Sequence, residues 1–153
     1  PDFGGKLASY HDHLFGNIFK SIIQEFRLDE TRMAYGGYSL GGLAAISSLY
    51  SSDKMPFIFS ICGSFWYPDF VDYCQSHQLL NKSCSVYLRN GLTEGAKHKN
   101  RLAKAPSYAK EVHECIKKQC LSTYSAFDPY GHHDNLQERY DAFSDWLIEE
   151  WKL

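Results

Sequence analysis

The sequence predicts an α/β fold in which a parallel sheet carries helices on both faces, and three observations support this prediction. Short apolar runs alternate along the chain with longer segments of helical periodicity. Polar or glycine-containing turns separate them, and no proline-rich or glycine-rich linker divides the chain. Strands that alternate with helices of this length are typical of β-α-β units. We therefore expect a single domain over residues 1–153.

The chain begins with a segment of helical periodicity. Its apolar residues fall in two adjacent rows, which together predict a helix with a wide buried face. The first row contains Tyr10, Leu14, Ile18, Ile22 and Phe26, and the second contains Phe15, Phe19 and Ile23.

Four strands and four further helices are expected after this segment, in alternation. The predicted strands are residues 32–38, 56–62, 83–88 and 122–127. The predicted helices are residues 40–50, residues 67–80, a segment with Tyr108, Val112, Cys115 and Ile116 on one face, and a last helix with the stripe Leu136, Tyr140, Phe143, Leu147 and Trp151. Ligands of such sheets bind at the carboxyl ends of the strands. Polar loops fall at those ends, at residues 36–42, 63–67, 90–94 and 128–134.

Composition limits the classes of protein to which the chain can belong. A chain of 153 residues, 44% of them hydrophobic, can bury roughly 70% of its unfolded surface. Its mean hydropathy of -0.41 and the lack of an apolar run near 18 residues exclude a spanning helix, so no membrane partner is expected. The net charge of -2 gives no general field for holding a polyphosphate, so nucleic acid is not expected either.

The cysteines indicate neither a disulfide framework nor a zinc ribbon. There are five of them, an odd number, and no two form a CxxC pair. Reduced thiols in a cytoplasmic protein fit this pattern best. We expect no metal and no cofactor.

The strongest local signal is a GxSxG motif formed by Gly37, Tyr38, Ser39, Leu40 and Gly41. It follows a predicted strand and precedes a predicted helix. A nucleophile on such a turn sits at strained backbone angles, and the flanking glycines let strand and helix approach closely. Ser39 is therefore the candidate nucleophile, and the N–H of Leu40 is the candidate oxyanion donor.

A serine nucleophile needs a base from a later loop and an acid to orient that base. His132 and His133 follow the last predicted strand, and Glu94 is the only carboxylate in the loop after the third. The order serine, acid, histidine is the chain order of α/β hydrolases. Asp128 and Asp134, on the histidines' own loop, are the alternative acids, although Asp134 is more simply an N-cap for the last helix.

These motifs resemble the esterase branch of the α/β-hydrolase superfamily that includes esterase D and enterochelin esterase-like proteins. The segments that carry the resemblance are residues 38–43, 63–67, 86–88 with Gly91 and Glu94, and 131–134. The resemblance implies Ser39 as nucleophile, Glu94 at the acid position and a histidine of the last segment as base.

The resemblance also ranks the two histidines. Family members commonly have a His-Asp pair followed by an arginine near the start of the final helix, and His133, Asp134 and Arg139 match that pattern. We therefore expect His133 to be the base, with His132 as the alternative.

The chain departs from the family at its beginning. The early strands and the first oxyanion loop of the family have no counterpart before Gly37. That loop normally supplies a second N–H donor, so only the Leu40 donor is expected here. We expect this to be the C-terminal part of a longer esterase, or a shortened one. Its first strand would then have an open edge through which two copies could associate.

The sequence thus predicts a serine esterase that hydrolyses a small carboxylic ester through an acyl-enzyme. Trp66 and Tyr67 are candidates for the acyl or alcohol pocket, with core packing as the equal alternative. The basic residues Lys97, His98, Lys99 and Arg101 would suit an acidic substrate, but a solvated loop is the simpler interpretation. The alternatives are an acyltransferase that uses the same triad, and a non-catalytic partial domain that binds a partner chain.

Overall fold

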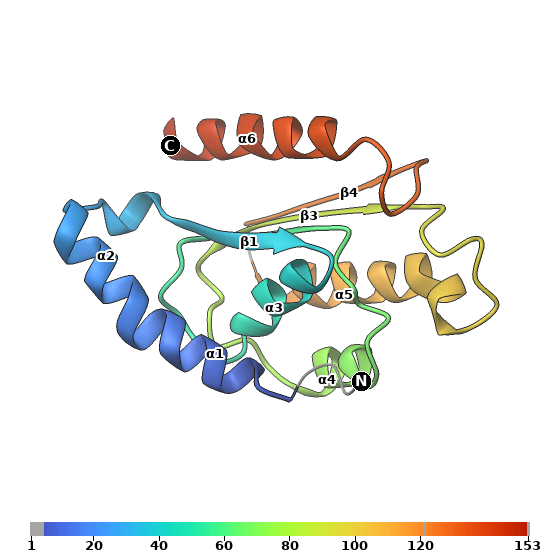
Figure 1. Cartoon of the computed structure of the whole chain (residues 1–153), viewed down its shortest axis with the longest axis horizontal. Helices are drawn as coiled ribbons and strands as arrows, with labels where there is room; N and C mark the ends of the chain where they lie inside the picture. Colours follow the sequence, from blue (N-terminus) through green and yellow to red (C-terminus); the bar gives the residue numbers. More distant parts are fainter. Residues whose placement is uncertain (1–4, 121, 153) are drawn as a thin grey trace.

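A computed structural model describes residues 5–120 and 122–152, and its strands form one parallel sheet (Figure 1). The strands lie in the spatial order β1-β2-β3-β4, which is also their order along the chain. They are β1 (Ala34–Tyr38), β2 (Phe57–Ile61), β3 (Ser85–Gly91) and β4 (Ser122–Asp128). This arrangement confirms the predicted parallel sheet.

Helices cover both faces of the sheet, as predicted. The helix α6 lies along one face, and α3 and α5 lie along the other (Figure 1). The α-helices are α1 (Leu7–His13), α2 (Phe19–Phe26), α3 (Leu40–Ser48), α4 (Phe70–Ser76), α5 (Ala105–Gln119) and α6 (Leu136–Lys152), with short 3-10 turns at Glu30–Arg32 and Arg101–Lys104. None of the helices in the described ranges is long and apolar enough to cross a membrane.

The register brings the functional loops to one edge of the sheet. The strands start in line, because Ala34 pairs with Phe57, Phe57 with Ser85, and Ser85 with Ser122. All strands run in the same direction, so their carboxyl ends also lie together. β3 and β4 continue further than β1 and β2, which places the loops that follow them above the ends of the shorter strands.

The core has two parts, one on each face of the sheet. The larger part packs under α3 and α5 and includes Ile46, Ile58, Val86, Val112 and Ile116, all at most 1% exposed. The smaller part packs under α6 and consists of Ile61, Cys62, Tyr87, Phe143 and Leu147.

The first predicted helix is present, but half of its predicted buried face is exposed. α1 and α2 are joined by a π-helical turn at Leu14–Ile18, which adds an extra residue and rotates the face that follows. In the second row, Phe15 and Phe19 are buried against the core. In the first row, Tyr10 is 49% and Phe26 is 63% exposed. Most of the first row is exposed because the second row faces the core beneath β1 and α3, where Phe15 packs edge-on against Tyr35. Leu14 is the exception in the first row, since it is partly buried against the same core.

Candidate active site

Ser39 lies at the turn between β1 and α3, with φ 59° and ψ -119°. Non-glycine residues rarely adopt such angles, which cost about 1–3 kcal/mol. The surrounding glycines permit the turn, since a Cβ on Gly37 would lie 3.0 Å from the backbone of Gly41. The turn is fixed by the N–H of Ser39, which donates to the carbonyl of Ile61 at 3.0 Å. The backbone therefore has the strain expected from the motif.

Leu40 is the first residue of α3. The first N–H groups of a helix have no acceptor within the helix, and they lie at the positive end of its dipole. The N–H of Leu40 is thus in a position suited to stabilising negative charge next to Ser39.

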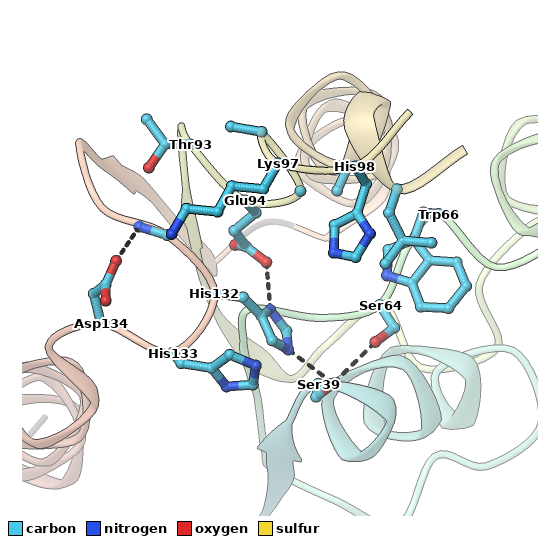
Figure 2. A pocket seen from close by; sticks show the side chains of 15 residues that line it. Ser39, Ser64, Trp66, Thr93, Glu94, Lys97, His98, His132, His133 and Asp134 are labelled. Atoms are coloured by element: carbon cyan, nitrogen blue, oxygen red, sulfur yellow. Dashed lines mark hydrogen bonds and ion pairs between the residues drawn. The ribbon is translucent and has the colours of Figure 1, made fainter. Parts of the chain in front are cut away.

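Ser39, His132 and Glu94 form a continuous hydrogen-bonded line (Figure 2). Nε2 of His132 lies 3.0 Å from Oγ of Ser39, and its Nδ1 lies 2.7 Å from Oε2 of Glu94. The three residues come from the loops that follow β1, β3 and β4. The line has the geometry of a nucleophile, a base and an orienting acid.

The structure corrects the expectation about which of the two histidines faces Ser39. His132 contacts Ser39, whereas the exposed side chain of His133 points to the phenol of Tyr38, with 2.8 Å between its Nδ1 and the Tyr38 oxygen. The prediction of His133 was wrong because it rested on the neighbouring Asp134. That carboxylate instead accepts the N–H of Gly131 within the loop, at 2.9 Å.

Glu94 is buried, with 4% of its surface exposed, and each carboxylate oxygen has a partner. Oε1 accepts hydrogen bonds from the N–H of Gly91 at 2.6 Å and from Nδ2 of Asn90 at 3.1 Å. Oε2 faces His132. These donors offset the cost of burying the carboxylate and fix its orientation.

The alternative acid Asp128 has a different partner. It accepts two hydrogen bonds from the buried guanidinium of Arg139, at 2.6 and 2.8 Å, and one from Arg89 at 3.1 Å. Burial raises the pKa of Asp128, but the bonds from Arg139 and Arg89 outweigh it and hold that pKa below its usual value. Arg139 also donates to the carbonyls of Gly131 and His132, so the pair braces the histidine loop.

Two polar groups next to the line were not singled out from the sequence. Oγ of Ser64 lies 3.1 Å from Oγ of Ser39. Asn90 contacts Glu94 through its Nδ2, while its Oδ1 lies 3.0 Å from Nε2 of the buried His113. Burial, more than the charge of Lys117, lowers the pKa of His113 to about 3, so its ring is neutral at physiological pH. No local motif marks these residues, because their importance comes from the fold.

A cavity of about 380 Å³ opens beside Ser39 (Figure 2). Trp66 lines it, and Lys97 and His98 of the basic cluster lie on its wall. Tyr67 does not line this cavity. It belongs instead to a second, more apolar cavity of about 670 Å³, which Leu40 also lines.

One group of side chains in the described ranges could be considered for a metal ion. Ligand atoms of Cys62, Glu94 and His132 lie within 4.8 Å of one another. However, burial raises the pKa of the Cys62 thiol, and Nη1 of Arg139 lies 2.9 Å from its sulfur. A protonated thiol beside a guanidinium is a poor cation ligand. Glu94 and His132 are better explained by their contacts with each other and with Ser39.

The chain has the α/β-hydrolase fold, as comparison with solved structures shows. The enterobactin esterase of Shigella flexneri matches with a TM-score of 0.74 and 17% identity, over 95% of this chain and 37% of that one. A carboxylesterase of Bacillus cereus matches with a TM-score of 0.64 and 16% identity, over 94% and 61%. A ferulic acid esterase matches with a TM-score of 0.65 and 15% identity, over 90% and 58%. The chain thus spans between about a third and three fifths of the length of these proteins.

Sequence comparison adds no further relative. No protein-family model matches the chain, and a search of the curated proteins finds no match.

Proposed function

We propose that the protein is a serine hydrolase that cleaves carboxylic esters through an acyl-enzyme. The observation that supports this most strongly is the line of Ser39, His132 and Glu94, with Ser39 on a strained turn beside an open cavity. The solved structures with the same fold include several esterases, which is consistent with the proposal.

In the first half of the reaction, Oγ of Ser39 attacks the ester carbonyl carbon while Nε2 of His132 takes its proton. The carbonyl oxygen becomes an oxyanion that accepts the N–H of Leu40, and one such donor is typically worth about 3 kcal/mol of barrier. Glu94 stabilises the imidazolium that forms. His132 then gives the proton to the alkoxy oxygen, the bond to this oxygen breaks, and the alcohol leaves.

In the second half, His132 removes a proton from a water molecule, whose oxygen attacks the acyl carbon. The acid leaves when the bond to Oγ of Ser39 breaks and Oγ recovers its proton from His132. This sequence of steps uses neither a metal nor a cofactor. If an alcohol attacks in place of water, the same residues transfer the acyl group, and a change in product ratio with added alcohol would reveal this.

The test is hydrolysis of p-nitrophenyl acetate by the wild type and by Ser39→Ala. We expect the variant to lose at least about 10³-fold in kcat/KM. The matched control is Ser60→Ala in β2, because Oγ of Ser60 is buried with no hydrogen-bond partner in the described part of the chain. Turnover by Ser39→Ala close to that of the wild type would contradict the proposal.

A second candidate function is association with another chain, and a separate observation favours it. β1 is an edge strand, and the row of helical residues beside it is exposed at Tyr10, Ile18, Ile22 and Phe26. Exposed strand edges and contiguous apolar surface both promote association. Light scattering coupled to size exclusion tests this: a mass above 17.6 kDa would support self-association, and a monomer at all concentrations would contradict it.

A further inference from the structure

We propose that Ser64 is a further catalytic residue, whose hydroxyl donates a hydrogen bond to Oγ of Ser39 as that oxygen becomes the nucleophile. The inference rests on the proposed function, since it concerns the same reaction. Ser64 lies in the loop after β2, and its Oγ is 3.1 Å from Oγ of Ser39 (Figure 2). The inference starts from this contact.

The direction of this hydrogen bond follows from the protons available. The carboxylate of Glu94 only accepts hydrogen bonds, so Nδ1 of His132 carries a proton at the 2.7 Å contact between them. In a neutral imidazole Nε2 is then an acceptor, and the proton of Ser39 must point toward it across 3.0 Å. Ser39 has no second proton, so Ser64 is the donor to Ser39.

The backbone holds Ser64 in this position. Its N–H donates to the carbonyl of Ser39 at 3.0 Å, which adds a main-chain link to the contact between the side chains. The preceding residue, Gly63, accepts a hydrogen bond from Nδ2 of Asn90 at 3.4 Å, and Asn90 also contacts Glu94. Ser64 is 1% exposed, so little water competes for its hydroxyl. A buried donor that the backbone holds in place needs little reorganisation when charge develops.

The donor affects the steps in which the charge on Oγ changes. As His132 takes the proton and the bond to the acyl carbon forms, Oγ carries partial negative charge, which the O–H of Ser64 stabilises. In the acyl-enzyme Oγ is an ester oxygen and a weaker acceptor. When the acyl bond breaks, the charge returns before His132 gives back the proton, and the donor acts again. Ser64 should therefore affect acylation and deacylation more than substrate binding.

The experiment is the pre-steady-state burst of p-nitrophenol from p-nitrophenyl acetate, which separates the acylation rate constant from the substrate dissociation constant. For Ser64→Ala we expect acylation to slow by about 10-fold to 100-fold, with the dissociation constant within about twofold of the wild type. The control variant is Ser60→Ala, which replaces another buried serine near the turn and should keep the wild-type acylation rate. Equal acylation in Ser64→Ala and the wild type would overturn the inference about Ser64 alone. A wild type that forms no acyl-enzyme would overturn the proposed function as well.

Ser64→Cys separates donation from packing. The thiol fills the space of the hydroxyl but donates weakly. We expect this variant to remain at least about fivefold slower than the wild type in acylation, with an unchanged unfolding temperature. Acylation as fast as in the wild type would mean that the volume of Ser64 matters rather than its donor, and would overturn the inference.

Discussion

Replacing Arg139 by methionine should destabilise the protein strongly, because this arginine is fully buried at 0% exposure. Its guanidinium donates to both carboxylate oxygens of Asp128, at 2.6 and 2.8 Å, and to the carbonyls of Gly131 and His132. Methionine fills a similar space and removes these hydrogen bonds, together with the one from Nη1 to Sγ of Cys62 at 2.9 Å. The carboxylate of Asp128 would remain buried, with Arg89 as its remaining cationic partner among the described residues.

The expected loss follows from these contacts. Removing one partner of a buried ion pair typically costs 3–5 kcal/mol, because the other charge is left without compensation. Arg89 still neutralises part of the charge on Asp128, so we expect the lower end, about 3 kcal/mol of the free energy of unfolding. For a chain of this length that corresponds to a fall of about 6–12 °C in Tm.

Urea denaturation and thermal melting measure this loss. The control is Lys152→Met on the same helix, since Lys152 forms an exposed ion pair with Glu149, with the two side chains 61% and 71% exposed. Such pairs contribute about 0–1 kcal/mol. The reasoning would be refuted if Arg139→Met were destabilised by no more than this control.

Three further predictions concern the histidines and the acid. His132→Ala should lower kcat/KM for p-nitrophenyl acetate by at least about 10³-fold, and His133→Ala by less than about threefold, because of the two histidines His132 is the one that contacts Ser39. A larger loss in His133→Ala than in His132→Ala would contradict the geometry. Glu94→Gln should reduce kcat/KM by about 10³-fold to 10⁴-fold without unfolding the protein, since an amide cannot stabilise the imidazolium as a carboxylate does, and a loss below about 10-fold would count against its role. Burial lowers the folded-state pKa of His113 to about 3, so between about pH 6.5 and 3 the unfolded chain binds a proton that the folded chain does not. As the pH is lowered through this range, the free energy of unfolding should decrease by up to about 1.4 kcal/mol per pH unit. Urea titrations of His113→Gln should lack this component, and an unchanged slope would contradict the prediction.

The sheet and the position of Ser39 were predictable because both follow from local pattern. Alternation of apolar runs and helical periodicity fixes the order of strands and helices, and the GxSxG motif describes one strained turn through neighbouring residues alone. Glu94 could also be predicted from the sequence, because it is the only carboxylate in its loop.

The choice between His132 and His133 was not predictable in this way. The two residues are adjacent, so whichever faces Ser39 depends on the path of the loop. That path is set by contacts with distant residues: Tyr38 donates to the carbonyl of His132 at 3.0 Å, and Arg139 to the same carbonyl at 3.3 Å. A sequence pattern carries no information about such contacts.

The exposure of the first helical row has a similar explanation. Periodicity shows which side chains share a face, but burial depends on what packs against that face. Phe15 and Phe19 face the core, whereas Tyr10 and Phe26 face away from it. Ser64 was missed because its contact with Ser39 joins residues that lie 25 positions apart.

The most direct test of the central claim is the mass of the intact protein after reaction with a fluorophosphonate, which labels only serines activated by a base. We predict one adduct on the wild type at Ser39, no adduct on Ser39→Ala or His132→Ala, and one adduct on His133→Ala. A wild type that remains unlabelled, or an adduct that persists in Ser39→Ala, would contradict the assignment of Ser39 and His132 as nucleophile and base.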